Sequence, residues 1–178
     1  MTIEILQLFW HLLPAGISNM TPPLLKKINL LNKPVDFGKK YRGRRILGDH
    51  KTWRGFLFGT LAAIIFIYLQ RGLTNTLNLN TIISYNSSNL FLLGFLFGFG
   101  ALFGDALKSF FKRQSDIPPG KPWIPFDQID WVFGAILMSE VYVRLTAYQV
   151  ITTLVLFGLL HPVVNFISYL MGIQKNKL

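Results

Sequence analysis

Residues 104–130 read GDALKSFFKRQSDIPPGKPWIPFDQID, and this stretch ends one apolar segment, crosses a proline-rich link and opens the next apolar segment. In a helix, Asp105, Lys108, Ser109 and Lys112 fall at positions i, i+3, i+4 and i+7 and share one face. A carboxylate, a hydroxyl and two ammonium groups on one face can hold both a metal ion and a phosphate. The stretch therefore predicts a polar site between two apolar helices.

Asp127 and Asp130 stand three residues apart where the second apolar run begins. They share a helix face near the positive end of the helix dipole, so they should stay ionised, as metal ligands must. Each acidic residue also has a structural interpretation: Asp105 could pair with Lys108 or Ser109, and Asp127 could be a helix N-cap. A charge near the bilayer centre costs about 2.5 to 3.5 kcal/mol on insertion scales, so clustered intramembrane carboxylates favour function.

Composition indicates an integral membrane protein. The chain has 178 residues, of which 51% are hydrophobic, and its mean hydropathy is +0.41. This length suits several membrane spans and little else, so we expect one multi-pass domain over residues 1–178. We predict an all-α fold with about five transmembrane helices, at about 3–25, 56–70, 90–111, 127–145 and 149–171. The absence of cysteine excludes disulfides and thiolate metal sites.

Local signals add detail to these spans. Prolines, among them Pro14, predict a kinked or partly unwound first span, which could line a lipid entrance. Arg71 is expected at the far end of the second span. Glu140 and Arg144 are expected to pair at i, i+4 in the fourth span. The polar residues of the fifth span, His161 and Asn165, are interpreted as a kink with local polar pairing.

Glycines in the third span predict close helix contacts. Gly94, Gly98, Gly100 and Gly104 form two overlapping pairs with four-residue spacing. Small residues at this spacing let helix backbones approach closely. We expect this packing to bring Asp105 inward, away from lipid.

The distribution of charge predicts the topology. Residues 26–54 hold ten of the eighteen Lys and Arg, which makes this loop cytoplasmic by the positive-inside rule. With the N-terminus outside, 16 of the 18 basic residues lie inside, including Lys175 and Lys177, and only Arg71 and Arg144 lie outside. We therefore predict a cell-membrane protein whose polar site faces the cytoplasm.

The basic loop ends in Gly48-Asp49-His50-Lys51-Thr52-Trp53-Arg54-Gly55. Glycine lets a backbone approach phosphate closely, and Lys51 and Arg54 could neutralise its charge. The segment is not a P-loop, because that motif needs lysine directly after its second glycine and a strand before it.

Carboxylates beside surplus Lys and Arg suggest a divalent cation carried with a polyphosphate. Magnesium keeps several waters and binds through one or two carboxylates plus substrate phosphates, so the three aspartates suit one or two Mg²⁺ ions, with a second, monovalent cation as an alternative. Such a site fits phosphoryl or nucleotidyl transfer. The chain shows no Ser/His/Asp arrangement or metal-binding histidine pair, which disfavours acyl transfer and zinc hydrolysis.

These motifs resemble a known family. Gly104-Asp105, Ser109-x-x-Lys112-Arg113 and Asp127-Gln128-x-Asp130 resemble the signature of CDP-diacylglycerol synthases. The segment 48–55 and the form Asp127-Gln128-Ile129-Asp130 are more similar to the CDP-archaeol synthase family, and the resemblance covers nearly the whole chain. Two positions depart from the pattern: His50 stands where a small residue is expected, and Asp116 follows a shortened motif, so Asp116 is left out of the metal set.

The resemblance implies a magnesium-dependent reaction of CTP with an unsaturated archaeal diether glycerol phosphate, giving CDP-archaeol and pyrophosphate. It implies metal binding by Asp105, Asp127 and Asp130, with Lys112 completing the catalytic set. The implied substrate-binding residues are Lys51, Thr52, Arg54, Lys108, Ser109, Arg113 and Gln128. The expected partners are CTP, a prenylated glycerol phosphate lipid and the bilayer, with no nucleic acid.

Two other functions fit parts of the pattern. A cation or phosphate transporter would also place carboxylates beside broken helices. A non-catalytic adaptor could dock anionic lipid or RNA through the basic loop, but it leaves the aspartates unexplained. Prenyl ether and fatty ester chains would occupy similar apolar grooves, so the sequence leaves the lipid chains open, together with the number of metals, the oligomeric state and glycosylation at Asn86.

Overall fold

The computed structural model describes residues 2–118 and 120–172, and Pro119, Lys175 and Lys177 lie outside the described residues. The all-α prediction is confirmed: five helices and one short hairpin make up the regular structure of the described ranges. The elements are α1 (Thr2–Leu24), β1 (Lys40–Tyr41), β2 (Arg44–Arg45), α2 (Trp53–Leu77), α3 (Leu90–Gln114), α4 (Phe126–Ser139) and α5 (Ala147–Leu170).

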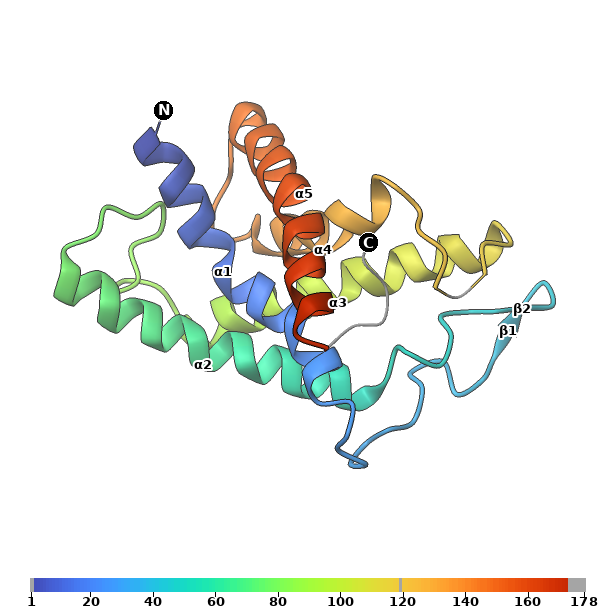
Figure 1. The fold of residues 1–178 in the computed structure, drawn as a ribbon. Helices are drawn as coiled ribbons and strands as arrows, with labels where there is room; N and C mark the ends of the chain where they lie inside the picture. Colours follow the sequence, from blue (N-terminus) through green and yellow to red (C-terminus); the bar gives the residue numbers. More distant parts are fainter. Residues whose placement is uncertain (1, 119, 173–178) are drawn as a thin grey trace.

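Helix α3 is the centre of the fold. It packs most extensively on α4 and α2 and also contacts α1, while α5 rests on α4 and α1 (Figure 1). The core that forms where these helices meet includes Leu12, Leu93, Phe97, Ala101 and Val132, all at most 1% exposed. The β1–β2 hairpin extends from one end of the bundle (Figure 1).

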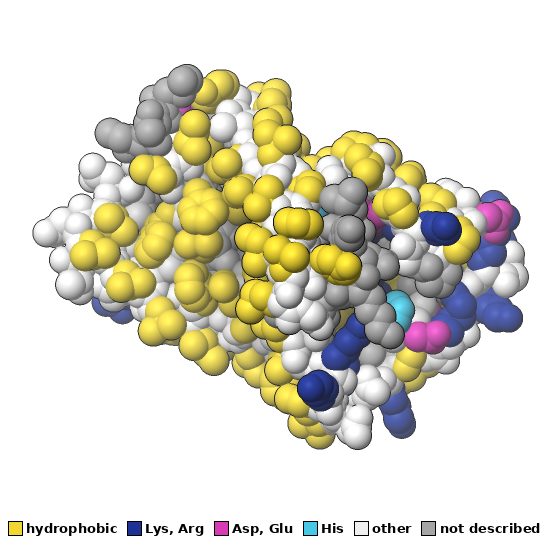
Figure 2. Space-filling model, viewed as in Figure 1, with side chains coloured by type: hydrophobic (Ala, Val, Ile, Leu, Met, Phe, Trp, Pro, Cys, Tyr) yellow, Lys and Arg dark blue, Asp and Glu magenta, His cyan; other side chains and the backbone are white. Residues whose placement is uncertain are grey.

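Among the described residues, three helices, α2, α3 and α5, are long and apolar enough to cross a membrane, judged by length and composition. In α5, most hydrophobic side chains are exposed, and only Thr153 and Phe157 are buried. Such a surface suits lipid contact, because lipid tails are as apolar as leucine. In Figure 2, hydrophobic side chains cover much of the visible face, and Lys and Arg gather at the end that carries β1 and β2.

Two helix ends differ from the predicted spans. Helix α2 continues past Arg71 to Leu77. The Arg71 Nε–H donates to Asn86 Oδ1 at 3.1 Å, so this charged side chain has a polar partner although it lies within the helix. Helix α4 stops at Ser139, well before residue 145, so the expected Glu140–Arg144 pair on a helix is wrong. No ion pair joins these two residues in the described part of the chain.

The proline-containing first helix is continuous, so the alternative of a partly unwound span is wrong. Pro14 has no N–H to donate to the Trp10 carbonyl, which would lose its usual partner. The Gln70 side chain of α2 donates to that carbonyl at 2.7 Å instead. One turn further on, Ser18 Oγ donates to the Gly98 carbonyl of α3 at 2.9 Å. These two hydrogen bonds connect α1 to α2 and to α3.

The basic loop is folded around one carboxylate, that of Asp36. Its side chain is 1% exposed and accepts hydrogen bonds from Arg45 Nη2 at 2.9 Å and from the backbone N–H of Leu47 and Gly48 at 2.9 and 3.0 Å. Burial alone raises the pKa of Asp36, but these hydrogen bonds and one from the Gly38 N–H outweigh it and hold the pKa well below its ordinary value. The loop therefore has a fixed shape.

The loop is also attached to the end of α3. Arg44 Nη1 donates to the Gln114 carbonyl at 2.5 Å, and Arg44 pairs with Asp116. The Gln114 side chain donates back to the Arg45 carbonyl at 3.4 Å. This attachment places the last loop residues, including Lys51, beside α3.

Candidate active site

Glycines bring the two acidic helices into backbone contact. A Cβ atom added at Gly104 of α3 would lie 3.0 Å from the Cα of Gly134 in α4, and one at Gly100 would lie 2.7 Å from the Gly134 carbonyl oxygen. Gly94 and Gly98 make equally close approaches to α2. The predicted small-residue packing is thus confirmed: the first glycine pair packs against α2 and the second against α4. Asp105 follows Gly104 directly and lies where α3 and α4 touch.

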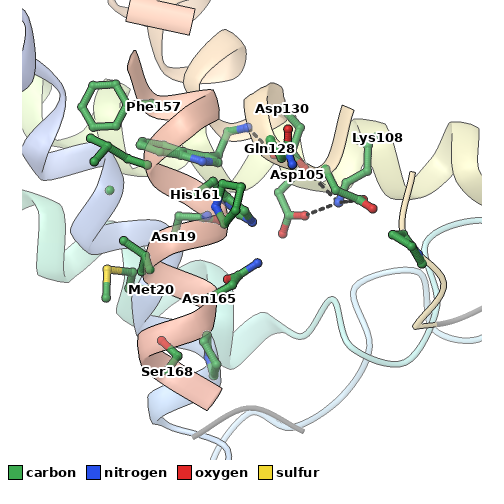
Figure 3. A pocket seen from close by; sticks show the side chains of 18 of the residues that line it. Asn19, Met20, Asp105, Lys108, Gln128, Asp130, Phe157, His161, Asn165 and Ser168 are labelled. Atoms are coloured by element: carbon green, nitrogen blue, oxygen red, sulfur yellow. Dashed lines mark hydrogen bonds and ion pairs between the residues drawn. The ribbon is translucent and has the colours of Figure 1, made fainter. Parts of the chain in front are cut away.

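One ammonium group lies among the three predicted carboxylates. Lys108 Nζ is 3.3 Å from Asp105 Oδ1, 2.8 Å from Asp127 Oδ1 and 2.9 Å from Asp130 Oδ2 (Figure 3). The four side chains are 5 to 22% exposed, so water screens their attraction only partly. The carboxylates of α3 and α4 therefore converge on a single cation.

Two further lysines form ion pairs with this cluster. Lys51 of the loop pairs with Asp105, and Lys112 pairs with Asp127 at 2.8 Å. Asp127 also accepts a hydrogen bond from the Trp123 N–H at 2.5 Å. Asp127 is not the N-cap of α4, because Pro125 occupies that position and makes no side-chain capping bond.

The first cavity beside this cluster has a volume of about 590 Å³. Apolar side chains of α1 and α5, such as Leu13, Met20 and Leu160, line one part of it. Asp105, Lys108, Lys112, Asp127, Gln128 and Asp130 line the other part. The cavity thus has a charged part against α3 and α4 and a largely apolar part between α1 and α5. An amphiphile with an anionic head group fits this distribution.

A second cavity, of about 560 Å³, lies between the folded loop and α3. Its lining includes six basic residues, namely Arg44, Arg45, Lys51, Lys108, Lys112 and Arg113. The two acidic residues of its lining, Asp49 and Asp116, pair with Arg45 and Arg44. Of the other four, Lys51, Lys108 and Lys112 pair with the acidic cluster, and Arg113 makes no ion pair in the described part of the chain. A row of Lys and Arg side chains suits a polyphosphate. Lys108 and Lys112 line both cavities and thus mark the place where they meet.

The structure places the other predicted substrate residues as follows. Gln128 lines the first cavity, and Arg113 and Ser109 line the second. The Ser109 hydroxyl donates to the Asp105 carbonyl at 2.9 Å, and its oxygen can still accept a hydrogen bond.

Thr52 and Arg54 are not brought to either cavity. Thr52 is the N-cap of α2, and its hydroxyl accepts from the Gly55 N–H at 3.2 Å. The Arg54 guanidinium is buried and donates to the backbone carbonyls of Ile28 and, at 3.4 Å, Lys26. Thr52 thus caps α2 and Arg54 holds the folded loop, and only Lys51 of the three reaches the acidic cluster.

Sequence reasoning missed a set of cavity residues on α1 and α5. Asn19, His161, Asn165 and Ser168 line the first cavity, opposite the acidic cluster (Figure 3). His161 and Asn165 were expected to pair locally at a kink, but neither side chain makes a hydrogen bond or ion pair within residues 2–118 and 120–172. The spacing 161, 165, 168 in an otherwise apolar helix was the available signal, since it defines one helix face.

The donor set can be tested against a divalent cation. Three carboxylates directed at one point are the hard oxygen ligands that Mg²⁺ prefers. Within the described residues, however, no group of three or more acidic or histidine side chains is arranged to hold a metal ion. The Lys108 ammonium lies at the point on which the carboxylates converge. The residues therefore fit a cation, provided that Lys108 leaves this position.

Comparisons with known proteins identify the family to which this chain is similar. A family model described as CarS-like, CDP-archaeol synthase, matches residues 1–177. The CDP-archaeol synthase of Thermococcus onnurineus (strain NA1) is 36% identical over 171 residues, which cover 95% of this chain and 94% of that protein. The CDP-archaeol synthase of Archaeoglobus fulgidus is 32% identical over 176 residues, with 96% of each chain covered.

A solved structure supports the same relationship at the level of the fold. It is described as an intramembrane enzyme for the biosynthesis of archaeal membrane lipids. The two folds superpose with a TM-score of 0.74 at 30% sequence identity, covering 91% of this chain and 94% of that chain.

Proposed function

The chain belongs to the CDP-archaeol synthase family, and from this premise we propose how its two cavities carry out the reaction. The protein is a CTP-dependent cytidylyltransferase of archaeal lipid synthesis, which transfers CMP from CTP to a lipid phosphate. The observation that carries the proposal is that Lys108 and Lys112 line both an amphiphilic cavity and a cationic one.

The lipid occupies the first cavity and the nucleotide the second. A prenylated glycerol phosphate would place its chains between α1 and α5 and its phosphate at the charged end. The triphosphate of CTP would lie along the basic residues of the loop and α3, where paired and unpaired cations offset its charge. The two phosphates to be joined then meet at Lys108 and Lys112.

In the reaction, an oxygen of the lipid phosphate attacks the α-phosphorus of CTP. The bond between the α-phosphorus and its bridging oxygen to the β-phosphorus breaks, and pyrophosphate leaves with the electron pair. A phosphate monoester is largely ionised near neutral pH, so no general base is required. Positioning by the two cavities and charge neutralisation by Lys51, Lys112 and Arg113 supply the catalysis.

Magnesium is part of this proposal. Asp105, Asp127 and Asp130 would hold it, and the bound ion would supply further neutralisation of phosphate charge. Lys108 would then be released from the three carboxylates and would be available to the phosphates that meet beside it.

The orientation of the protein in the membrane is also part of the proposal. The N-terminus lies outside and the site faces the cytoplasm, because CTP is supplied there and the basic loop belongs on that side. Lys and Arg side chains gather on the visible face at the end that carries the loop, which agrees with this assignment (Figure 2).

The direct test incubates purified protein with labelled CTP, an unsaturated diether glycerol phosphate and Mg²⁺. We expect a labelled CDP-lipid and an equal amount of pyrophosphate. Asp105→Asn, Asp127→Asn and Asp130→Asn should each abolish the product, because each removes one of the converging charges. Glu140→Gln, which changes a carboxylate outside both cavities, is the matched control.

Two outcomes would contradict the proposal. Uptake of phosphate or cation into vesicles without any lipid product would favour a transporter. Normal turnover in one of the three Asp→Asn variants would remove that residue from the site.

A further inference from the structure

Helix α5 has a polar face although its surroundings are apolar. Its most apolar 18-residue window has a mean hydropathy of 2.0, yet His161, Asn165 and Ser168 follow one another at helical spacing in its second half. These three residues are only partly exposed, whereas neighbours on the other faces, such as Val163 and Phe166, are exposed. The helix thus turns its polar residues inward.

This polar face lines the first cavity. His161 and Asn165 project from α5 towards the side of the cavity that holds Asp105 (Figure 3). Neither side chain makes a hydrogen bond or an ion pair in the described ranges, and both line the cavity. A polar side chain without a partner is costly inside a membrane. The missing partner is therefore expected to be a molecule that enters the cavity.

The position of the two residues indicates which part of that molecule they contact. The phosphate of the lipid would lie against the ammonium groups of Lys108 and Lys112, and the chains would lie against Leu13 and Leu160. His161 and Asn165 lie on the wall opposite the charged cluster and next to the apolar part. The part of the lipid between phosphate and chains is the glycerol unit with its ether oxygens. An amide N–H donates well to such uncharged oxygens.

We propose that Asn165, together with His161, binds the glycerol diether unit of the lipid substrate and so positions the lipid phosphate for attack. The inference rests on the proposed function, because it assigns the first cavity to the lipid. The two residues are positioning residues: they touch the lipid at a distance from the reacting phosphorus. They select a lipid phosphate that carries oxygen atoms next to its chains.

The test compares the KM for the lipid with the KM for CTP in Asn165→Leu and His161→Leu. Loss of one hydrogen bond between uncharged groups should raise the KM for the lipid roughly threefold to tenfold. The KM for CTP should stay the same, because the nucleotide cavity does not include α5. Thr152→Val is the matched control, since Thr152 is a polar residue of α5 that lines neither cavity and makes no hydrogen bond in the described chain.

A second measurement separates the glycerol unit from the rest of the lipid. A long-chain alkyl phosphate, which has the phosphate and a chain but no ether oxygens, is used as a competitive inhibitor of the wild type and both variants. We expect its inhibition constant to be equal in all three, while the KM for the diether lipid differs. Asn165→Ser, which keeps a donor, should recover part of the wild-type affinity.

Three results would overturn the inference: an unchanged KM for the lipid, a matching loss of affinity for the alkyl phosphate, or an increase in the KM for CTP. A variant that fails to fold would lose CTP binding as well, and Asn165→Ser then decides the question. If the wild type forms no CDP-lipid at all, the proposed function itself has failed, which is a different result from wild-type turnover with insensitive α5 variants.

Discussion

Lys108 shows how one residue sets the state of the site. Three carboxylates from two helices would repel one another if no cation lay between them. The Lys108 ammonium lies within 3.3 Å of an oxygen of each. It therefore offsets the charge that the proposed divalent cation would offset, and the two should compete for the same carboxylates.

This competition predicts the behaviour of Lys108→Met. Without divalent cations the variant should be less stable by up to about 3 kcal/mol, because the partly buried carboxylates lose their shared partner. Mg²⁺ should then raise its melting temperature more than that of the wild type, which a thermal shift assay in detergent with EDTA or MgCl₂ would measure. Lys121→Met, at a cavity lysine without an ion pair in the described chain, is the control. Equal Mg²⁺ shifts in both variants would contradict the idea.

Asp36 is the residue on which the basic loop depends. Its pKa is held below the ordinary value of about 3.9, so it contributes stability fully above pH 4 and loses that contribution as the pH falls through the lowered pKa. Asp36→Asn should lower the melting temperature at pH 7 by roughly 3 to 10 °C. It should also weaken the dependence of stability on pH below 4.

Melting curves of the wild type and Asp36→Asn between pH 3 and 7 would check this. Asp49→Asn serves as control, because Asp49 pairs with the same Arg45 but its side chain is 76% exposed. A control variant as unstable as Asp36→Asn would show that loss of any Arg45 partner suffices, and that burial of Asp36 is not the cause.

At the scale of elements, the contact between α3 and α4 fixes the distance between the acidic residues. Gly104 and Gly134 allow the two backbones to touch, and each stands beside or one turn from an aspartate of the cluster. No side chain separates the helices there, so the Asp130 carboxylate and the Lys108 ammonium come within 2.9 Å.

Gly104→Ala should therefore damage function through geometry alone. Its Cβ has no room beside Gly134, so α3 and α4 must separate, at a cost of about 1 to 3 kcal/mol. A displacement of about 1 Å between reacting groups can reduce turnover about 100-fold. Gly72→Ala, which adds a Cβ on α2 with nothing within 4 Å, should leave turnover unchanged. Steady-state kinetics with CTP and lipid would measure both, and full activity of Gly104→Ala would show that the contact is not required.

At the scale of the whole molecule, charge and hydrophobicity are separated along the bundle. Basic residues gather at the end with the folded loop, and hydrophobic side chains cover much of the rest of the visible face (Figure 2). The connection between α2 and α3, residues 78–89, carries no charge and lies at the end of these helices away from the basic loop. This asymmetry is the basis of the predicted orientation in the membrane.

The lack of cysteine makes the orientation simple to test. A single cysteine at exposed Lys40 or exposed Ser87 would be the sole thiol of the chain. In intact cells, a membrane-impermeant maleimide should label Ser87→Cys and leave Lys40→Cys unlabelled until the cells are opened. The reverse pattern would place the basic loop and the catalytic site outside.

The sequence by itself determined where the helices lie and which acidic residues belong to the candidate site. Hydrophobic runs, the glycine spacing of α3, and the placement of Asp105, Asp127 and Asp130 are local patterns, and local patterns decide which residues share a helix face. The same patterns misplaced the ends of α2 and α4, because Arg71 was expected at the end of one span and Glu140 and Arg144 as a pair within another. In the structure, Arg71 finds its partner Asn86 within a longer α2, and α4 stops at Ser139.

Only the tertiary structure decided which polar groups face one another. It placed Lys108 among three carboxylates, bound Arg54 to the loop backbone, and turned His161 and Asn165 into the cavity. Each of these contacts joins segments far apart in the chain or depends on the rotation of a helix against its neighbours. Such contacts follow from how whole helices pack, and no spacing within a single segment contains that information.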